Sequence, residues 1–284
     1  MLIRYPGSKA KLAKELFQMF PPELHSLWSQ SLGFEYREPF FGAGAVGFDV
    51  LQMISHSCTA WLNDADPGMV ALWRSVQTNP QRLCDMIHAF KPSAGKFYEY
   101  KEQDDAEIAD EVERGFVKLA LHRLSFSGLG YRAGGPIGGA TQQSSKYNVS
   151  CRWNPERMIS DVVSLHKRMK RFRGRVRITC GDFMPLIADA PKGSFIYLDP
   201  PYYDKGPQLY KFSMTHDDHV RLADALRECK ATWVLSYDDH DAIRELYSWA
   251  KFIELKAFKT MKYTMATQRG GERPKNKEVA ITAA

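Results

Sequence analysis

Short apolar segments that alternate with helical segments constrain the fold of this chain more than any other feature of its sequence. Segments with strand character lie at 36–40, 59–62, 176–180, 195–198 and 232–236. Helical patterns of apolar residues lie between or after them, notably at 9–20, 217–228 and 241–249. Alternating strands and helices are typical of a mostly parallel sheet that helices cover on both faces. The sequence therefore predicts an α/β fold.

The middle of the chain departs from this alternation. Helical patterns at 80–90 and 107–124 lead into a glycine-rich stretch, 125–145, that fits no regular element. Loops of this length inside a compact protein are usually functional or disordered. The 284 residues exceed a single domain of ~150 residues but fall short of two comfortable ones. We therefore expect one α/β domain that is split by a helical insertion with a glycine-rich tip.

Composition excludes several classes of protein. Hydrophobic residues at 44% and charged residues at 25% are ordinary globular values, which excludes a disordered chain. No apolar run approaches the ~20 residues that span a bilayer, and residues 1–7 lack the layout of a signal peptide. We expect a cytoplasmic protein with no membrane association. The five scattered cysteines, with no Cys-x-x-Cys spacing, support neither a disulfide framework nor a zinc site.

The net charge of +6 is modest, but the charges are unevenly placed. Residues 99–113 are mostly acidic, and the simplest interpretation is a solvated surface. Residues 167–177 contain only basic charges, and Met169 and Phe172 interrupt them. A basic run of this kind is about equally consistent with binding to a nucleic-acid phosphate backbone and with a solvent-exposed surface.

A glycine turn follows the first predicted strand. Gly42 and Gly44 let the backbone approach a ligand, and the start of the next helix offers unpaired N–H groups. Asp64 ends the next strand, where α/β nucleotide sites place a carboxylate that accepts from ribose hydroxyls. The alternatives are a plain tight turn and a helix cap for a helix near Pro67. Because a third glycine is missing, an adenosine-bearing ligand without a pyrophosphate fits better than a dinucleotide.

The sharpest signal is the apolar segment 195–198, which runs directly into Asp199-Pro200-Pro201-Tyr202. Two consecutive prolines impose a rigid, extended turn. They fix a carboxylate, a proline carbonyl and an aromatic ring at the carboxyl end of a strand, where open α/β sheets bind ligands. This cluster offers two acceptors to an amino group and a flat face to a planar base. The alternative is a proline turn with an unrelated tyrosine.

Weaker signals lie at two other strand or helix ends. Tyr5 and Lys9 flank the start of the first helix, where a carboxylate or phosphate could bind, although a capped helix with a solvated lysine is simpler. Asp182 and Phe183 follow the segment 176–180, and Asp182 could reach an adenine amino group or be an ordinary turn carboxylate. The acidic and histidine-containing groups at 217–219 and 238–241 are interpreted as helix caps, and no metal is expected.

Taken in this order, the segments resemble the Dam-type adenine-specific DNA methyltransferases over nearly the whole chain. The shared pattern is aromatic-x-Gly-x-Lys, Glu-Pro-Phe-x-Gly-x-Gly-x-Val, an acidic residue, an inserted region, Gly-Asp-Phe and Asp-Pro-Pro-Tyr. Further matches lie at 212–226, 235–238 and 244–247. The joint pattern is specific, although Asp-Pro-Pro-Tyr alone also occurs in other amino-group methyltransferases.

The resemblance implies a Rossmann-like sheet that binds S-adenosylmethionine, formed by residues 1–66 and 158–284. It implies that a mainly helical insertion, residues 67–157, recognises the DNA target. The residues that it implies for the cofactor are Tyr5 and Lys9 against the methionine part, Phe41, Gly42 and Gly44 around the pocket, Asp64 at the ribose, and Asp182 and Phe183 at the adenine. The residues that it implies for the target base are Asp199, Pro200, Pro201 and Tyr202.

The implied reaction is site-specific transfer of a methyl group to the N6 amino group of an adenine flipped out of double-stranded DNA, without a metal or an obligate protein partner. The Asp199 carboxylate and the Pro200 carbonyl would accept the two amino hydrogens, and Tyr202 would stack on the base. The stretch 130–145 differs from the arginine-rich loop of the members that recognise GATC, so that specificity is not implied. The candidates for DNA contacts are Arg132, Asn148, Arg152, Lys170, Arg171 and Arg173.

Three alternatives stay open on the sequence. The same chemistry could act on adenine in RNA or on the amino group of cytosine. Protein-glutamine methylation shares a Pro-Pro-Tyr site but usually has Asn in place of Asp199 and no long insertion. A non-catalytic DNA-binding relative is the third alternative, and the intact stretch from Asp199 to Tyr202, with Gly42 and Gly44, argues against a decayed active site.

Overall fold

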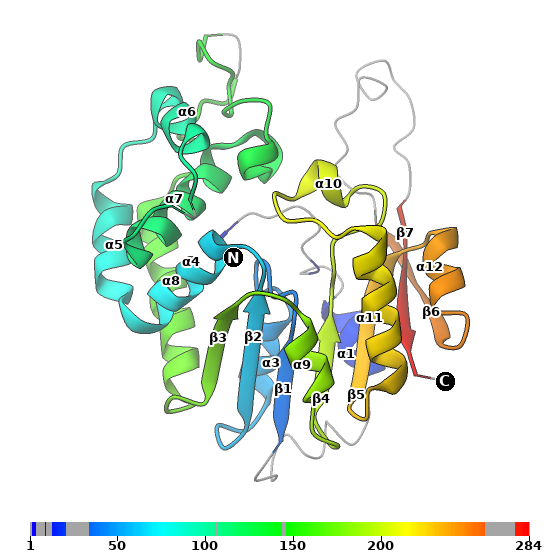
Figure 1. The fold of residues 1–284 in the computed structure, drawn as a ribbon. Helices are drawn as coiled ribbons and strands as arrows, with labels where there is room; N and C mark the ends of the chain where they lie inside the picture. The colour runs from blue at the N-terminus through cyan, green and yellow to red at the C-terminus, as the bar shows by residue number, and fades with distance from the viewer. Residues whose placement is uncertain are drawn as a thin grey trace.

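A computed structural model describes residues 2–3, 9, 13–20, 34–105, 107–143, 146–258 and 276–283. One sheet has the strand order β3-β2-β1-β4-β5-β7-β6 (Figure 1). Its strands are β1 (Glu35–Glu38), β2 (Thr59–Asp64), β3 (Val176–Cys180), β4 (Phe195–Leu198), β5 (Thr232–Asp238), β6 (Lys251–Phe258) and β7 (Asn276–Thr282). Strands β1 to β5 pair in parallel, and β7 pairs antiparallel with both β5 and β6. The predicted α/β class with a mostly parallel sheet is confirmed.

The helices fall into two groups. The group that accompanies the sheet is α1 (Ala13–Met19), α3 (Gly47–Met53), α9 (Met184–Ala188), α10 (Gly206–Leu209), α11 (His216–Glu228) and α12 (Asp241–Leu246). The group between β2 and β3 is α4 (Pro67–Thr78), α5 (Pro80–Ala89), α6 (Ala94–Glu102), α7 (Glu111–Leu124), the short 3-10 helices η2 (Phe126–Gly128) and η3 (Gly130–Arg132), and α8 (Pro155–Lys170). Figure 1 shows this second group gathered beyond the β3 edge of the sheet.

The four residues of β4 show why helices cover both faces of the sheet. All four are buried, and successive strand residues point to opposite faces. Phe195 and Tyr197 belong to a core cluster with α1, α3, α4 and α8. Ile196 and Leu198 belong to a second cluster with α11 and α12. The uninterrupted apolar segment therefore forms an interior strand, as expected where both faces of a parallel sheet are covered.

Several boundaries differ from the sequence predictions for local reasons. The first strand ends at Glu38 and not at residue 40, because Pro39 cannot donate to a strand partner and the chain turns. Helix α7 begins at Glu111, where the Asp110 side chain accepts from the Glu113 N–H. Helix α6 and the antiparallel strands β6 and β7 were not predicted, and they complete the insertion and the far edge of the sheet.

The insertion packs against the sheet at its base and has a small core of its own at its tip. Trp73 on α4 and Val162 on α8 lie in the same buried cluster as the sheet residues. The tip is built around Phe97, Leu121, Leu124, Ala133 and Val149. The domain limits at 67 and 157 remain a prediction. None of the described helices is both long and apolar enough to cross a membrane.

Candidate active site

One pocket lies where β1, β2, β3 and β4 reach their carboxyl ends. The residues predicted for the site that line it are Lys9, Phe41, Gly42, Asp64, Asp182, Phe183, Asp199 and Pro201. Parallel strands bring their carboxyl ends to one edge, so side chains far apart in the sequence meet there. Gly44, Pro200 and Tyr202 lie near the pocket but do not line it. Tyr5 lies outside the described residues.

The two glycines of the first turn have different roles. Both have a positive φ, 46° at Gly42 and 67° at Gly44, which an L side chain rarely adopts. The Gly42 N–H donates to Asp64 Oδ2 at 2.6 Å, and its carbonyl accepts from Trp73 Nε1 at 2.8 Å. A Cβ at Gly44 would collide with the rings of Phe41 and Phe48. Gly42 therefore forms the pocket, whereas Gly44 permits close packing behind it.

Backbone N–H groups hold the Asp64 carboxylate. Its Oδ1 accepts from the Asp66 N–H at 2.9 Å, and its Oδ2 accepts from Gly42. The carboxylate that caps α4 is Asp66, which accepts from Gly68 N and Met69 N. The helix-cap alternative for Asp64 is therefore wrong, because the cap lies two residues later. Burial, followed by the negative charge of Asp66, raises the pKa of Asp64 to about 6.

Side chains, rather than backbone groups, hold the Asp199 carboxylate. Lys9 Nζ lies 2.8 Å from Asp199 Oδ1, and Ser236 Oγ donates to the same oxygen at 3.0 Å. The Tyr197 hydroxyl lies 3.0 Å from Ser236 Oγ and extends this chain of polar groups. Among the described residues, Oδ2 has no hydrogen-bond partner. Burial raises the pKa of Asp199, although the Lys9 ammonium opposes this shift.

Lys9 lines the pocket and contacts several other polar groups. Its Nζ is 2.8 Å from Asp199 and 3.7 Å from Glu278 Oε2, and it donates to the Tyr202 hydroxyl at 3.4 Å. Burial lowers its pKa, but the carboxylates of Asp199 and Glu278 outweigh burial and hold it well above the usual value. The ammonium is therefore charged and neutralises Asp199. A contact between Lys9 and the methionine part of a cofactor remains a prediction.

Tyr202 uses its hydroxyl in a way that the sequence did not indicate. The hydroxyl donates to Glu278 Oε1 at 2.7 Å, and the whole residue is only 5% exposed. Tyr202 does not line the pocket, whereas the later aromatic residues Tyr210 and Phe212 do. Stacking of Tyr202 on a base remains a prediction. Sequence reasoning missed Glu278, because a single glutamate 76 residues after Tyr202 belongs to no motif that points to it.

Asp182 and Phe183 form the side of the pocket that faces α11. The Asp182 carboxylate accepts from the Met184 N–H at 2.8 Å and pairs with Arg221 at 3.2 Å. The Phe183 ring packs against Phe40, with centroids 5.3 Å apart, and the Arg221 guanidinium lies over it. Asp182 is half exposed, so it lies at the mouth of the pocket. Its contact with an adenine remains a prediction.

One residue of each of the two acidic and histidine-containing groups takes part in a helix cap. Asp218 and Thr215 form a reciprocal capping box at the start of α11. The His240 side chain accepts from Ala242 N at the start of α12, and Asp239 pairs with Arg244. Within the described part of the chain, no group of three or more His, Cys, Asp or Glu side chains is arranged to hold a metal ion.

The charge of the pocket favours a cationic ligand. Its carboxylates are Glu38, Asp64, Asp182, Asp199 and Asp218, and Lys9 is the lining residue with a positive charge among those described. Lys9 is already paired with Asp199. Burial raises the pKa of Glu38 well above its usual value, and this carboxyl accepts from the Tyr36 hydroxyl at 2.7 Å. Asp64, which bonds to the Gly42 N–H, is therefore the carboxylate in contact with the glycine turn, whereas Asp182 pairs with Arg221.

The candidate DNA contacts lie in two separate places. Arg132, Asn148 and Arg152 are exposed on the insertion. Lys170, Arg171 and Arg173 are also exposed, but they precede β3, whereas residues that line the pocket follow the carboxyl ends of the strands. The five residues of β3 separate its start, beside the basic residues, from its carboxyl end, beside the pocket, by about 16 Å. Met169 and Phe172 are buried, which explains the interruptions of the basic run as core positions.

Comparison with known proteins gives consistent results. The family model of the D12 class N6 adenine-specific DNA methyltransferases matches residues 5–261. The chain is 24% identical over 273 residues to Type II methyltransferase M1.LlaDCHI of Lactococcus lactis, covering 90% of this chain and 87% of that protein. It is 24% identical over 277 residues to the DNA adenine methylase of Haemophilus influenzae, covering 89% of this chain and 85% of that protein.

A solved structure from Listeria monocytogenes, assigned to the class I S-adenosylmethionine-dependent methyltransferases, is similar with a TM-score of 0.37 and 9% identity. The similarity covers 99% of this chain and 61% of that chain, so this chain spans less than two thirds of that protein. A similarity this distant does not extend to individual residues.

Proposed function

This chain belongs to the D12 class of N6 adenine-specific DNA methyltransferases, and we propose that Asp199 is the catalytic residue that activates an adenine flipped out of double-stranded DNA. The observation that carries this proposal is the geometry of its carboxylate. Lys9 and Ser236 both engage Oδ1, and Oδ2 is left without a partner among the described residues. A carboxylate held in this way at a pocket wall is an acceptor ready for an amino hydrogen.

The pocket fits S-adenosylmethionine as the methyl donor. When bound, this molecule supplies an electrophilic methyl group on a sulfonium. The predominance of carboxylates along the pocket suits its positive charge. Each Asp64 oxygen already accepts one backbone N–H and retains a lone pair for a ribose hydroxyl. Gly42, without a side chain, leaves room beside this carboxylate for the ligand.

Asp199 makes the adenine amino nitrogen a better nucleophile. The lone pair of an adenine amino group is delocalised into the ring, so the nitrogen attacks poorly. Hydrogen bonds from the amino group to Asp199 Oδ2 and the Pro200 carbonyl localise that lone pair toward the methyl group. Such acceptors are most effective where charge develops in the transition state. The rigid Pro200-Pro201 turn holds both acceptors without reorganisation.

Asp199 is also suited to take the proton that the amino group loses. Burial raises the pKa of its carboxyl, which favours proton uptake as positive charge develops on the nitrogen. Lys9 keeps the carboxylate ionised before the reaction, because its ammonium lies 2.8 Å from Oδ1. The two effects oppose each other, and the pKa of Asp199 stays above its usual value.

DNA would bind across the insertion and the mouth of the pocket. Arg132, Asn148 and Arg152 are exposed on the insertion and are our candidates for contacts with bases or phosphates. Lys170, Arg171 and Arg173 lie at the other end of β3, about 16 Å farther along the strand direction. They remain candidates for phosphate contacts with DNA that extends beyond the target site.

The test is transfer of tritiated methyl groups from S-adenosylmethionine to duplex DNA, followed by digestion to nucleosides. We expect N6-methyladenine as the product and no labelling of RNA of the same sequence. Methylated cytosine would overturn the base assignment. Long-read sequencing of DNA from a methylation-free host that expresses the protein identifies the recognition sequence, and a control host that expresses the Asp199→Ala variant should show unmodified DNA.

A further inference from the structure

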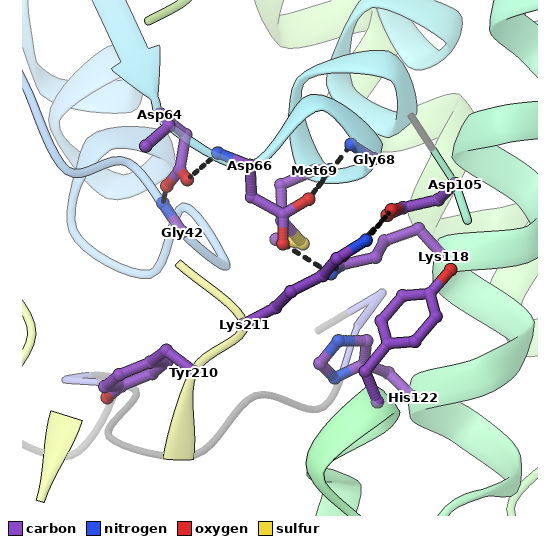
Figure 2. Close-up of polar contacts among 12 residues, drawn as sticks. Gly42, Asp64, Asp66, Gly68, Met69, Asp105, Lys118, His122, Tyr210 and Lys211 are labelled. Carbon is purple, nitrogen blue, oxygen red and sulfur yellow. Dashed lines mark hydrogen bonds and ion pairs between the residues drawn. The ribbon is translucent and has the colours of Figure 1, made fainter. Parts of the chain in front are cut away.

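The segment between Asp-Pro-Pro-Tyr and α11 is attached to the insertion at two adjacent residues. Arg132 Nε donates to the Tyr210 carbonyl at 3.1 Å. Lys211 Nζ donates to Asp105 Oδ1 at 2.7 Å (Figure 2). It also donates to Asp104 Oδ1 at 2.8 Å. The neighbouring aromatic residues Tyr210 and Phe212 line the pocket that contains Asp199. One wall of the pocket is therefore tied to the insertion.

The attachment of Lys211 continues into a buried row of alternating charges. Asp105 is fully buried, and its Oδ2 lies 3.9 Å from Lys118 Nζ. Lys118, which is 2% exposed, bonds to the carboxylate of Asp66. Asp66 caps α4 and donates its N–H to Asp64, so the row reaches the turn proposed for the ribose (Figure 2). The row Asp66–Lys118–Asp105–Lys211 thus connects two sides of the pocket through the insertion.

The surroundings leave this row little freedom to move. The Tyr131 ring lies beside both ammonium groups, with its centroid 5.2 Å from Lys118 Nζ and 4.6 Å from Lys211 Nζ. A Cβ at Gly68 would collide with Asp105 Oδ2. Buried charges are costly to leave unpaired, so each partner holds the next in position. The Lys211 end of the row is the part that meets the pocket wall.

The two attachments differ in their exposure. Arg132 is exposed and is itself a candidate DNA contact, so phosphate can compete with the Tyr210 carbonyl for its guanidinium. Lys211 is 27% exposed at its side chain, and its carboxylate partner Asp105 is entirely shielded. The link through Lys211 is therefore the one that is retained when DNA engages Arg132.

We propose that Lys211 is a positioning residue through which the inserted domain holds Tyr210 and Phe212 in the wall of the target-base pocket. This inference rests on the proposed function, because the pocket wall matters only if a base enters beside Asp199. Lys211 does not touch the reacting atoms. It acts by fixing the backbone between two aromatic side chains, so that the wall is already formed when the insertion binds DNA.

The test compares Lys211→Met, which keeps the length of the side chain and removes its charge, with Lys192→Met as the matched control. Lys192 is exposed in the turn before β4, at the edge of the sheet opposite to the pocket. Single-turnover methyl transfer is measured on duplex DNA of the recognition sequence. Capture of the flipped base is measured by the fluorescence of 2-aminopurine at the target position.

We expect Lys211→Met to slow methyl transfer by about 10²-fold, the cost of a misplacement near 1 Å, and to reduce the 2-aminopurine signal. Affinity for S-adenosylmethionine should be unchanged, and Lys211→Arg should restore most of the rate. Lys192→Met should behave as wild type. A wild-type rate and wild-type fluorescence in folded Lys211→Met would overturn the proposal.

Asp104→Asn covers the case in which Lys211→Met does not fold. It weakens the same attachment while Asp105 stays paired, and we expect a smaller loss of the 2-aminopurine signal in a protein of normal stability. An unchanged signal in that variant also overturns the proposal. Failure of the wild-type protein to methylate adenine would instead refute the proposed function, which keeps the two failures distinct.

Discussion

Asp64 ends β2 and Asp199 follows β4 of the same sheet, but their carboxylates are held in different ways. Asp64 accepts from two backbone N–H groups, one in its own turn and one in the glycine turn. Asp199 is held by the side chains of Lys9 and Ser236, which come from distant parts of the sequence. The first is thereby suited to bind a neutral hydroxyl, and the second to bear a changing charge during a reaction.

The groups that shift the pKa values of the two carboxyls also differ. Burial raises the pKa of both carboxyls. At Asp64 the adjacent Asp66 raises the pKa further, and the stabilising hydrogen bonds come from the backbone. At Asp199 the ammonium of Lys9 is the main group that opposes burial. The ionisation of Asp199 therefore depends mainly on the Lys9 ammonium, whereas that of Asp64 depends mainly on backbone N–H groups, with a smaller effect of Lys118.

Removal of the Asp199 carboxylate should have the largest effect. Asp199→Ala deletes the acceptor at the position where charge develops, so the rate of methyl transfer should fall by at least ~10²-fold. Affinity for S-adenosylmethionine, measured by calorimetry, should remain near the wild-type value because Asp64 is intact. Turnover like that of wild type would show that the two carboxylates do not differ in the way proposed.

Asp64→Ala should produce the opposite pattern. Loss of a buried acceptor should weaken S-adenosylmethionine binding by roughly 1–3 kcal/mol. The rate at saturating cofactor should fall much less than in Asp199→Ala. Calorimetry on the folded variant, with circular dichroism as the control for folding, measures this. Unchanged affinity would remove Asp64 from the cofactor site.

Lys9→Met tests the dependence of Asp199 on its cation. Without the ammonium, the pKa of Asp199 should rise further, and more of the carboxyl should be protonated at neutral pH. At a pH below the pKa, a rise of one unit in the pKa lowers the ionised fraction of the carboxyl by about tenfold. The rate should therefore fall at pH 7 and recover as the pH is raised. A pH profile parallel to that of wild type would count against this role.

The binding of S-adenosylmethionine should depend on pH through Asp64. The pKa of this carboxyl, about 6, lies above the usual 3.8, so it becomes protonated as the pH falls through about 6. Protonation removes an acceptor and a negative charge. Affinity should be constant above this range and should decrease by up to about tenfold per unit below it. Asp64→Asn is the control, and its affinity should lack this inflection.

Tyr202→Phe should have the smallest effect of the five. It removes the hydroxyl that donates to Glu278 and accepts from Lys9, and the ring remains. A lost hydrogen bond of this kind costs about 1 kcal/mol. We expect a several-fold lower rate with unchanged cofactor affinity. A loss as large as that of Asp199→Ala would mean that the hydroxyl, and not the ring, is the essential part of Tyr202.

The sequence alone determined the five parallel strands and the edge of the sheet at which the site forms. The turn at Asp199 follows from two prolines, and the turn at Gly42 follows from a residue that tolerates positive φ. Both are local effects of backbone geometry. Since the parallel strands end at one edge, these turns and Asp64 converge there without any further information.

Only the tertiary structure decided which side chains meet behind that edge. The pairing of Lys9 with Asp199, the bond from Tyr202 to Glu278 and the link from Lys211 to Asp105 join residues that no short motif relates. The same holds for the basic run, which the fold places at the start of β3 and away from the pocket. Contacts of this kind depend on how distant segments pack, whereas a local pattern constrains only its own backbone.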